Sequence, residues 1–236
     1  MNIKENILHI NERIARAKGS SPISAPKVTL LAASKMQGQG AIEEAIRAGI
    51  TCFGENRVQE AHEKWLGAWG LGLREKVQLH LIGALQTNKV RQALELFDVI
   101  QTLDREKLAK AISLEFRVLS AEKKEENTQN SALKTQHFYI QVNTGEEPQK
   151  SGVLPKDADG FIKYCIDDLK LPVVGLMCVP PADQPPAPHF ALLREIALRH
   201  NLDELSMGMS GDFETAIRMG ASCVRVGSGI FGERVA

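Results

Sequence analysis

The sequence predicts an α/β fold: a single (β/α)8 barrel, or TIM barrel, that takes up residues 1–236 as one domain and has an additional N-terminal helix. Short apolar runs alternate with helix-like segments along the chain. This alternation favours parallel strands, because each helix returns the chain to the same end of the sheet. The length of 236 residues is close to the roughly 250 typical of such barrels. No GxGxxG motif follows the first apolar run, which disfavours the runner-up, an open doubly wound sheet.

The N-terminal segment, residues 1–19, predicts an amphipathic helix ahead of the first strand. It is charged throughout, which is not the pattern of a signal peptide, and no apolar run in the sequence approaches membrane-spanning length. Its apolar residues recur at helical spacing: Ile3, Ile7, Leu8, Ile10 and Ile14.

Eight strand-like runs follow, each identified by consecutive or alternating apolar residues that end in turn residues. Together with those turn residues they are 28–34, 51–54, 77–83, 97–103, 137–145, 171–180, 203–211 and 221–232. The helices expected between them are 40–49, 56–67, 85–96, 104–116, 156–169, 188–201 and 212–220. Two segments break this rhythm. Residues 120–136 are polar and charged and predict a solvated loop, and residues 180–188 contain five prolines and predict a stiff loop.

The composition limits the class of ligand and partner. Lys and Arg number 29, as do Asp and Glu, so the net charge is zero and no overall basic field attracts nucleic acid or an anionic membrane. We therefore expect neither as a partner, and any anion must be held locally. The four cysteines lie far apart without a CxxC pair, which predicts neither a metal site nor a disulfide framework. The simplest location is the reducing cytoplasm.

The loops after the seventh and eighth strands predict an anion site. In (β/α)8 barrels these loops commonly bind phosphate. Ser210 and Gly211 lead into a helix expected to begin near residues 211–212, whose N–H groups would face an anion. Gly227 and Ser228 follow the eighth strand and let the backbone approach a ligand. Taken singly, these residues could equally be a helix cap and ordinary turns.

Strand parity places two cations beside this anion site. Val224 and Val226 suit the helix-facing side of the eighth strand, so Arg225 between them should project toward the barrel interior. Lys35 ends the first strand, which adjoins the eighth when a barrel closes. The alternatives are a structural salt bridge for Arg225 and a solvent-facing end for Lys35.

An amine, a guanidinium and a phosphate site at one barrel mouth suit a phosphorylated carbonyl compound. Lys35 would attack the carbonyl and form a Schiff base. Two ligand classes satisfy this pattern. One is pyridoxal 5′-phosphate (PLP), whose ring nitrogen would meet Arg225, and the other is a phosphosugar in an aldolase-like enzyme. The residues alone leave both open.

Several sequence blocks favour PLP over a phosphosugar, because together they resemble a known protein family. They are "AASK" (32–35), "FGENRVQEA" (53–61), "LHLIGALQTNK" (79–89), "QVNTGEEPQKSG" (141–152), "GLM" (175–177), "SMGMSGDFETAI" (206–217) and "VRVGSGIFGER" (224–234). In this order they resemble the pyridoxal phosphate homeostasis protein family, also called the YggS/PROSC family. The resemblance implies a barrel of the alanine racemase N-terminal type, with PLP on Lys35. One departure is "MQGQG" after Lys35, where relatives often have a Lys-Pro type of stretch.

The resemblance also implies roles for further residues. Arg225 would face the pyridine nitrogen, Asn56 and His80 would lie near the cofactor, and the phosphate would be held by Ser210, Gly211, Gly227 and Ser228. For His80 the alternative is a satisfied core histidine. Lys150 matches a lysine of the family pattern and has no assigned role, its alternative being a solvated loop lysine.

The function expected from this reasoning is non-catalytic: a protein that holds PLP as a Schiff base on Lys35 in intracellular PLP homeostasis, as a monomer, and passes it transiently to PLP-dependent apoenzymes. A cation opposite the pyridine nitrogen disfavours its protonation and weakens the ring as an electron sink. Racemisation needs a second base, and the only tyrosines, Tyr139 and Tyr164, fall outside the expected site. The alternatives are a PLP-dependent amino acid racemase completed by an oligomer partner, and a phosphosugar Schiff-base enzyme.

Overall fold

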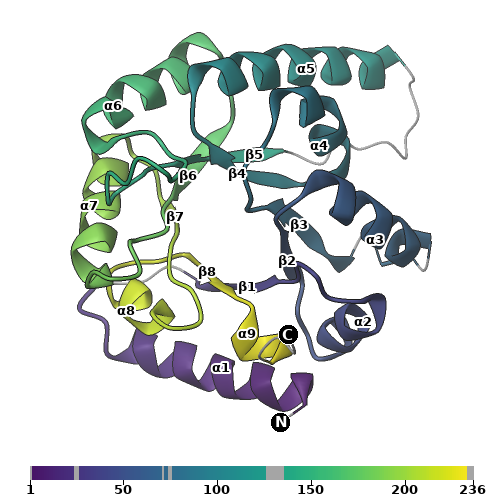
Figure 1. Cartoon of the computed structure of the whole chain (residues 1–236), viewed down its shortest axis with the longest axis vertical. Helices are drawn as coiled ribbons and strands as arrows, with labels where there is room; N and C mark the ends of the chain where they lie inside the picture. The colour runs from purple at the N-terminus through teal and green to yellow at the C-terminus, as the bar shows by residue number, and fades with distance from the viewer. Residues whose placement is uncertain (1, 24–26, 71, 74–75, 126–135, 233–236) are drawn as a thin grey trace.

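The computed structural model describes residues 2–23, 27–70, 72–73, 76–125 and 136–232. Within them the predicted fold is confirmed, since eight parallel strands form a closed barrel in sequence order, β1 to β8 (Figure 1). The strands are β1 Thr29–Ala33, β2 Cys52–Glu55, β3 Gln78–Leu81, β4 Val99–Leu103, β5 His137–Gln141, β6 Val173–Met177, β7 Glu204–Ser206 and β8 Cys223–Val226. Seven of them lie within the strand-like runs expected from the sequence, and β2 extends one residue beyond its run, to Glu55.

Helices surround the barrel (Figure 1). They are α1 Ile3–Gly19, α2 Gln39–Arg47, α3 Val58–Gly70, α4 Val90–Leu96, α5 Glu106–Glu125, α6 Pro155–Lys163, α7 Pro186–Arg199, α8 Phe213–Arg218 and α9 Ser228–Phe231. A 3-10 turn, η2 Thr87–Lys89, leads into α4, and a π-helical turn, η3 Tyr164–Asp168, continues α6. In the described part of the chain, no helix has both the length and the apolar character needed to cross a membrane.

Two expected loops are partly helical. Helix α5 extends to Glu125, so the first six residues of the predicted loop 120–136 belong to it, and the rest of that loop, apart from Gln136, lies outside the described residues. The Ala, Glu and Lys residues of this stretch have high helix propensity, which explains the extension. Helix α7 begins at Pro186, inside the predicted stiff loop 180–188. Proline is compatible with a first helical turn because the N–H it lacks would have no intrahelical partner there.

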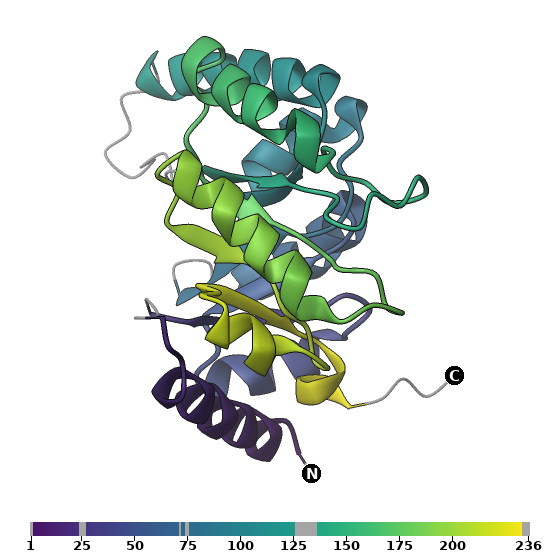
Figure 2. The ribbon, with the colours of Figure 1, turned by 90° about the vertical axis from the view of Figure 1, so that its left-hand side faces the viewer.

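Helix α1 packs beneath the last two helices, as Figures 1 and 2 show. A capping box starts it, in which the side chains of Asn2 and Glu5 each accept from the other's backbone N–H. Arg13 forms a two-point contact with Glu214 of α8, at 3.1 and 3.0 Å. Asn6 donates to the carbonyl oxygen of Ile230 in α9 at 2.9 Å. The first helix therefore supports the loops that follow β7 and β8.

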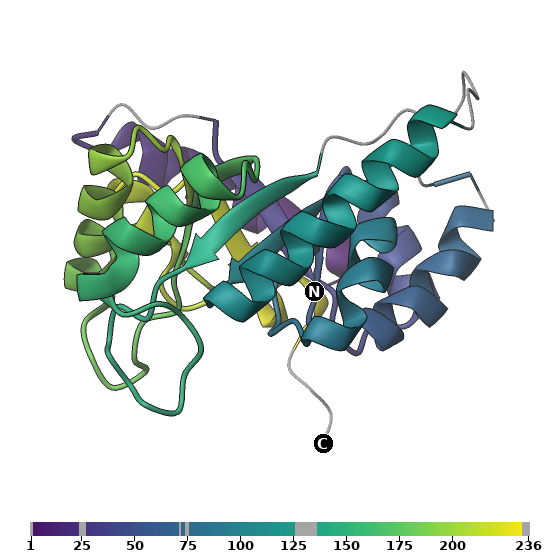
Figure 3. The ribbon, with the colours of Figure 1, turned by 90° about the horizontal axis from the view of Figure 1, so that it is seen from above.

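The barrel closes where β1 pairs with β8, with Leu31 opposite Arg225 and Ala32 opposite Val226. Val224 and Val226 belong to the main apolar core between strands and helices, whereas Leu31 and Cys223 form a small cluster of their own with Cys52. The expected parity of β8 is therefore observed. Figure 3 shows that the loops following β5 and β6 project from the barrel beyond the carboxyl ends of these strands.

Candidate functional site

Lys35 lies in a tight turn directly after β1. The backbone N–H of Gln37 donates to Ser34 O at 3.0 Å, and Met36 adopts a φ of 63°, a left-handed conformation that non-glycine residues rarely adopt. Helix α3 holds this turn from outside. Glu60 accepts from the Met36 N–H at 2.7 Å, and Lys64 Nζ donates to Ser34 O at 2.8 Å. The backbone around Lys35 is thus fixed on both sides by helix α3.

A buried carboxylate, that of Glu55, joins this turn to the end of β2. It accepts from Ser34 Oγ at 2.7 Å, from Lys64 Nζ at 3.0 Å and from Trp65 Nε1 at 3.1 Å, and its side chain is fully buried. A buried charge is tolerated when it is paired and hydrogen-bonded in this way. The ends of β1 and β2 are consequently tied to one helix.

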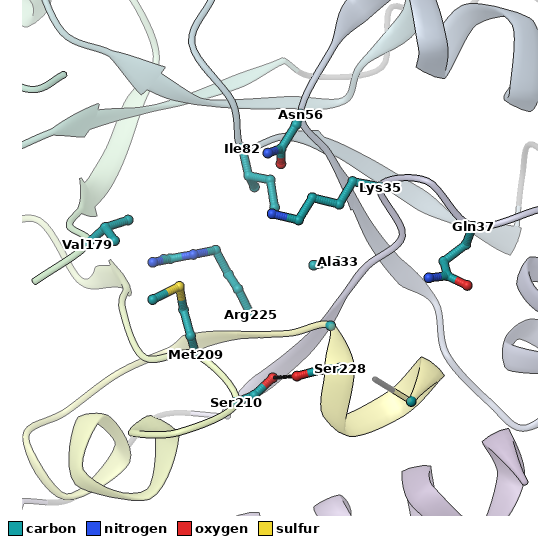
Figure 4. A pocket seen from close by; sticks show the side chains of 12 residues that line it. Ala33, Lys35, Gln37, Asn56, Ile82, Val179, Met209, Ser210, Arg225 and Ser228 are labelled. Carbon is teal, nitrogen blue, oxygen red and sulfur yellow. Dashed lines mark hydrogen bonds between the residues drawn. The ribbon is translucent and has the colours of Figure 1, made fainter. Parts of the chain in front are cut away.

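A cavity of about 510 Å³ opens at the carboxyl ends of the strands. We call it the upper cavity, and its size is within the roughly 300–1,000 Å³ typical of small-molecule sites. Figure 4 shows the side chains of Lys35 and Arg225 both reaching into it, Lys35 from the end of β1 and Arg225 from β8. Ile82, Val179 and Met209 add apolar surface to its lining.

Arg225 is only 5% exposed and is held by two neighbouring groups. Its Nη1 donates to Ser206 Oγ at 2.7 Å, and its Nη2 donates to the carbonyl oxygen of Cys178 at 2.8 Å. Neither acceptor is a carboxylate, so these contacts are not the structural salt bridge considered as the alternative. Burial lowers the pKa of Arg225 from its usual value, an effect opposed by Cys223, Cys178 and Asp212.

The loops after β7 and β8 meet through two hydroxyl groups. Ser228 Oγ lies 3.3 Å from Ser210 Oγ, and both side chains line the upper cavity together with the backbone of Gly227 (Figure 4). Ser228 also starts α9, where the N–H groups of Ser228 and Gly229 have no intrahelical acceptor, whereas those of Ile230 and Phe231 donate to Gly227 O. This corner therefore presents hydroxyl and N–H donors to an anion.

Helix α8 begins at Phe213 with Asp212 as its N-cap, close to the start predicted near residues 211–212. It has six residues, so its dipole adds little to anion binding. Gly208 sets the path of the preceding loop. It has a φ of 90°, and a Cβ there would lie 2.6 Å from the Cβ of Ala216. The sequence analysis missed this glycine, although "MGM" directly after a strand was a signal for it.

Six of the eight predicted site residues line the upper cavity: Lys35, Asn56, Ser210, Arg225, Gly227 and Ser228. Gly211 and His80 are not among its lining residues. Gly211 is exposed beside Ser210. His80 lines a second, smaller cavity of about 170 Å³, which we call the lower cavity. It is bordered by residues near the amino ends of the strands, including Thr29, Gln78, His137 and Glu204.

Asn56 follows β2 and owes its position to Gly83. A Cβ at Gly83 would overlap the backbone carbonyl oxygen of Asn56, so only glycine lets the loops after β2 and β3 approach this closely. Thr102 Oγ1 donates to the carbonyl oxygen of Gly83 at 2.8 Å and fixes the same loop from β4.

Lys150 does not line the upper cavity but connects two loops. Its Nζ donates to the carbonyl oxygen of Pro180 at 3.3 Å and pairs with Glu147 at 2.5 Å. The loops after β5 and β6 also meet at Gly145, where a Cβ would overlap the ring of Pro181. Lys150 is therefore a structural link between these loops.

Both tyrosines lie away from the upper cavity. Tyr139 is buried, lines the lower cavity and donates to Glu204 at 3.4 Å, and burial raises its pKa. Tyr164 starts η3 in the outer layer, where Lys110 lies over its ring at 5.8 Å. Among the residues that line the upper cavity, none is a tyrosine.

The sequence of the chain matches a family of proteins over nearly its whole length. The model of the alanine racemase N-terminal domain matches residues 4–235. The pyridoxal phosphate homeostasis protein of Haemophilus influenzae is 35% identical, with 99% of this chain and 97% of that protein covered. That of Pseudomonas aeruginosa is 37% identical, with 98% and 96% covered. The chain belongs to the pyridoxal phosphate homeostasis protein family.

Solved structures place this family among similar barrels. PipY of Synechococcus elongatus, solved with PLP bound, is 32% identical and superposes with a TM-score of 0.73, covering 94% of this chain and 99% of PipY. Alanine racemase of Corynebacterium glutamicum is 17% identical with a TM-score of 0.62, and the match covers 99% of this chain but 64% of the racemase. At that identity, the second comparison shows a shared fold alone.

Proposed function

We propose that this chain binds PLP in the upper cavity and acts in intracellular PLP homeostasis, without a catalytic cycle of its own. The observation that carries the proposal is the convergence of an amine, a guanidinium and two serine hydroxyls on one cavity of about 510 Å³. These groups match the aldehyde, the ring nitrogen and the phosphate of PLP. Family membership and the PLP-bound structure of PipY support the same ligand.

Each predicted site residue except His80 has a role in this proposal. Lys35 forms a Schiff base, in which its nitrogen bonds to the aldehyde carbon and the aldehyde oxygen leaves as water. Arg225 donates to the ring nitrogen, and Asn56 lies beside the ring. The phosphate accepts from the loops after β7 and β8, through Ser210, Gly211, Gly227 and Ser228. When bound, PLP supplies an electrophilic carbonyl, and the chain contributes the binding and the orientation.

The positions of the charged groups support a carrier over an enzyme. Arg225 presents a cation to the ring nitrogen, so that nitrogen is disfavoured from taking up a proton and the ring is a weaker electron sink. A racemase needs a second base within hydrogen-bond reach of the substrate. Tyr139 and Tyr164 do not line the upper cavity. We propose that the chain acts as a monomer that passes PLP to apoenzymes, in the cytoplasm, where its free cysteines Cys52, Cys165, Cys178 and Cys223 stay reduced.

The visible spectrum of the protein as purified tests the cofactor and the lysine together. We expect an absorption band of a PLP Schiff base, loss of that band on borohydride reduction, and a reduced adduct that peptide mapping assigns to Lys35. Lys35→Ala should lack the band, whereas Lys150→Ala, which changes a lysine outside the cavity, should keep it. A colourless protein that does not bind added PLP would contradict the proposal and favour the phosphosugar alternative.

Two measurements separate the carrier from the racemase. Amino acid racemisation at ordinary enzymatic rates, lost in Lys35→Ala, would refute the non-catalytic role. Sedimentation should give the mass of a 25.9 kDa monomer. A stable oligomer would instead support the alternative in which a partner subunit supplies the second base.

A further inference from the structure

Four buried polar side chains form one hydrogen-bonded relay through the barrel interior. Arg225 on β8 donates to Ser206 Oγ on β7 at 2.7 Å, and Ser206 Oγ donates to Gln101 Oε1 on β4 at 2.5 Å. Gln101 Nε2 lies 2.7 Å from Nδ1 of His80 on β3. The exposed fractions of the four residues are between 0% and 5%. The relay connects the upper cavity, which Arg225 lines, with the lower cavity, which His80 lines.

The guanidinium of Arg225 determines which way the protons of this relay point. It has donors only, so Ser206 Oγ accepts from it and uses its own hydrogen for Gln101. The distance of 2.5 Å between Ser206 Oγ and Gln101 Oε1 suits an O–H···O bond and is too short for an amide N–H···O bond. The NH2 group of Gln101 therefore faces His80, whose Nδ1 accepts and whose ring proton lies on Nε2.

His80 is suited to remain the neutral end of the relay. Its pKa is lowered to about 3, mainly by burial and to a smaller extent by His137, while Asp98 opposes the shift. Its Nε2 has no hydrogen-bond partner among the described residues, and the residue lines the lower cavity. A proton on Nδ1 would set two donors against each other, His80 Nδ1–H and the NH2 group of Gln101. The neutral Nε2–H tautomer is thus the form of His80 that is compatible with the hydrogen bonds of the relay.

We propose that Gln101 is a positioning residue for Arg225, anchored at its far end on His80 and acting through Ser206. This inference rests on the proposed PLP site. With Ser206 Oγ and Cys178 O both fixed, two adjacent N–H groups of the guanidinium are held and its plane is set. Its remaining N–H groups then stay directed at the upper cavity, where the ring nitrogen of PLP would accept. Without Gln101 the Ser206 hydroxyl loses its acceptor and is free to rotate away from this geometry.

The tautomer of His80 tests the relay in the protein without PLP. Ring 15N chemical shifts should show a neutral Nε2–H imidazole from pH 5 to pH 8, with the resonance assigned by its loss in His80→Asn. An Nδ1–H tautomer, or a ring that becomes charged in this range, would overturn the proposal. Since this measurement needs no cofactor, its result is independent of whether the chain binds PLP.

Affinity for PLP tests the positioning role. Gln101→Leu is expected to raise the dissociation constant of PLP about tenfold and to shift the visible band, because a bond to a charged group is loosened. Gln141→Leu is the matched control, since this strand glutamine donates to Ser151 O outside the relay and its loss should leave the affinity unchanged. A lower melting temperature of Gln101→Leu with unchanged affinity and band would refute positioning and leave a merely structural role.

Variants of His80 give the same readout if Gln101→Leu fails to fold. His80→Leu removes the acceptor at the end of the relay and should weaken PLP binding about as much as Gln101→Leu does. His80→Asn keeps an acceptor near the position of Nδ1 and should recover most of that affinity. Equal affinities for His80→Leu and His80→Asn would contradict the proposal. Absence of PLP binding by the unchanged protein would refute the proposed function, while the 15N result would still decide the relay.

Discussion

Replacing Lys64 by methionine should destabilise the fold through the carboxylate of Glu55. Lys64 Nζ lies 3.0 and 3.1 Å from the two oxygens of Glu55, and the two side chains are 10% and 0% exposed. Removing one partner of a buried ion pair costs about 3–5 kcal/mol. We expect the lower end, about 3 kcal/mol, because Ser34 and Trp65 still donate to the carboxylate. At about 2–4 °C per kcal/mol for a chain of this size, the melting temperature should fall by about 6–12 °C.

Urea unfolding followed by circular dichroism measures this loss, and two further variants identify its cause. Lys110→Met removes a cation that is 62% exposed and pairs with Glu106 at 3.4 Å, so it should change the free energy of unfolding by less than about 0.5 kcal/mol. Adding Glu55→Gln to Lys64→Met removes the unpaired buried charge and should restore at least about 1 kcal/mol of the free energy of unfolding. A loss below about 1 kcal/mol in Lys64→Met would refute the reasoning that the buried pair holds the Lys35 turn.

Further predictions concern a glycine and acid stability. Gly83→Ala should lower the affinity for PLP by displacing Asn56, measured by absorbance titration, whereas Gly160→Ala, whose added Cβ would meet nothing within 4 Å, should bind normally. Because the pKa of His80 falls from 6.5 to about 3 on folding, the unfolded chain binds more protons between these values. Acidification from pH 6.5 toward 3 should therefore cost up to about 1.4 kcal/mol per pH unit from this group. The free energy of unfolding of His80→Leu, measured by denaturation across this pH range, should lack that contribution. If its dependence on pH had the same slope as in the unchanged protein, this would argue against a neutral buried ring.

The architecture was predictable from the sequence because each strand is a short apolar run that ends in turn residues. Two boundaries were not predictable, since they depend on context. Pro186 fits α7 only because it falls in the first helical turn, and α5 continues past its apolar face through residues with high helix propensity alone. Parity along β8 placed Arg225 correctly in the interior, because alternation is a local property of a strand.

The supporting contacts of the site were harder to predict. Glu55 and Lys64 come from different elements, and their pairing depends on how α3 packs against β2. Gln101 did carry a signal, since a glutamine between Ile100 and Thr102 in a fully buried strand must find polar partners in the interior. Its partners, Ser206 and His80, are set by barrel closure and not by spacing along the chain.

The pairing of β1 with β8 also has a consequence for biosynthesis. Lys35 is translated about 190 residues before Arg225 and Ser228, and the seam between β1 and β8 brings them to one cavity. A nascent chain whose β8 has not yet left the ribosomal exit tunnel therefore exposes the amine of Lys35 before the rest of the upper cavity exists. Cofactor capture must therefore follow the synthesis of β8 and its pairing with β1, and contacts between such distant segments make that closure a slow step of folding.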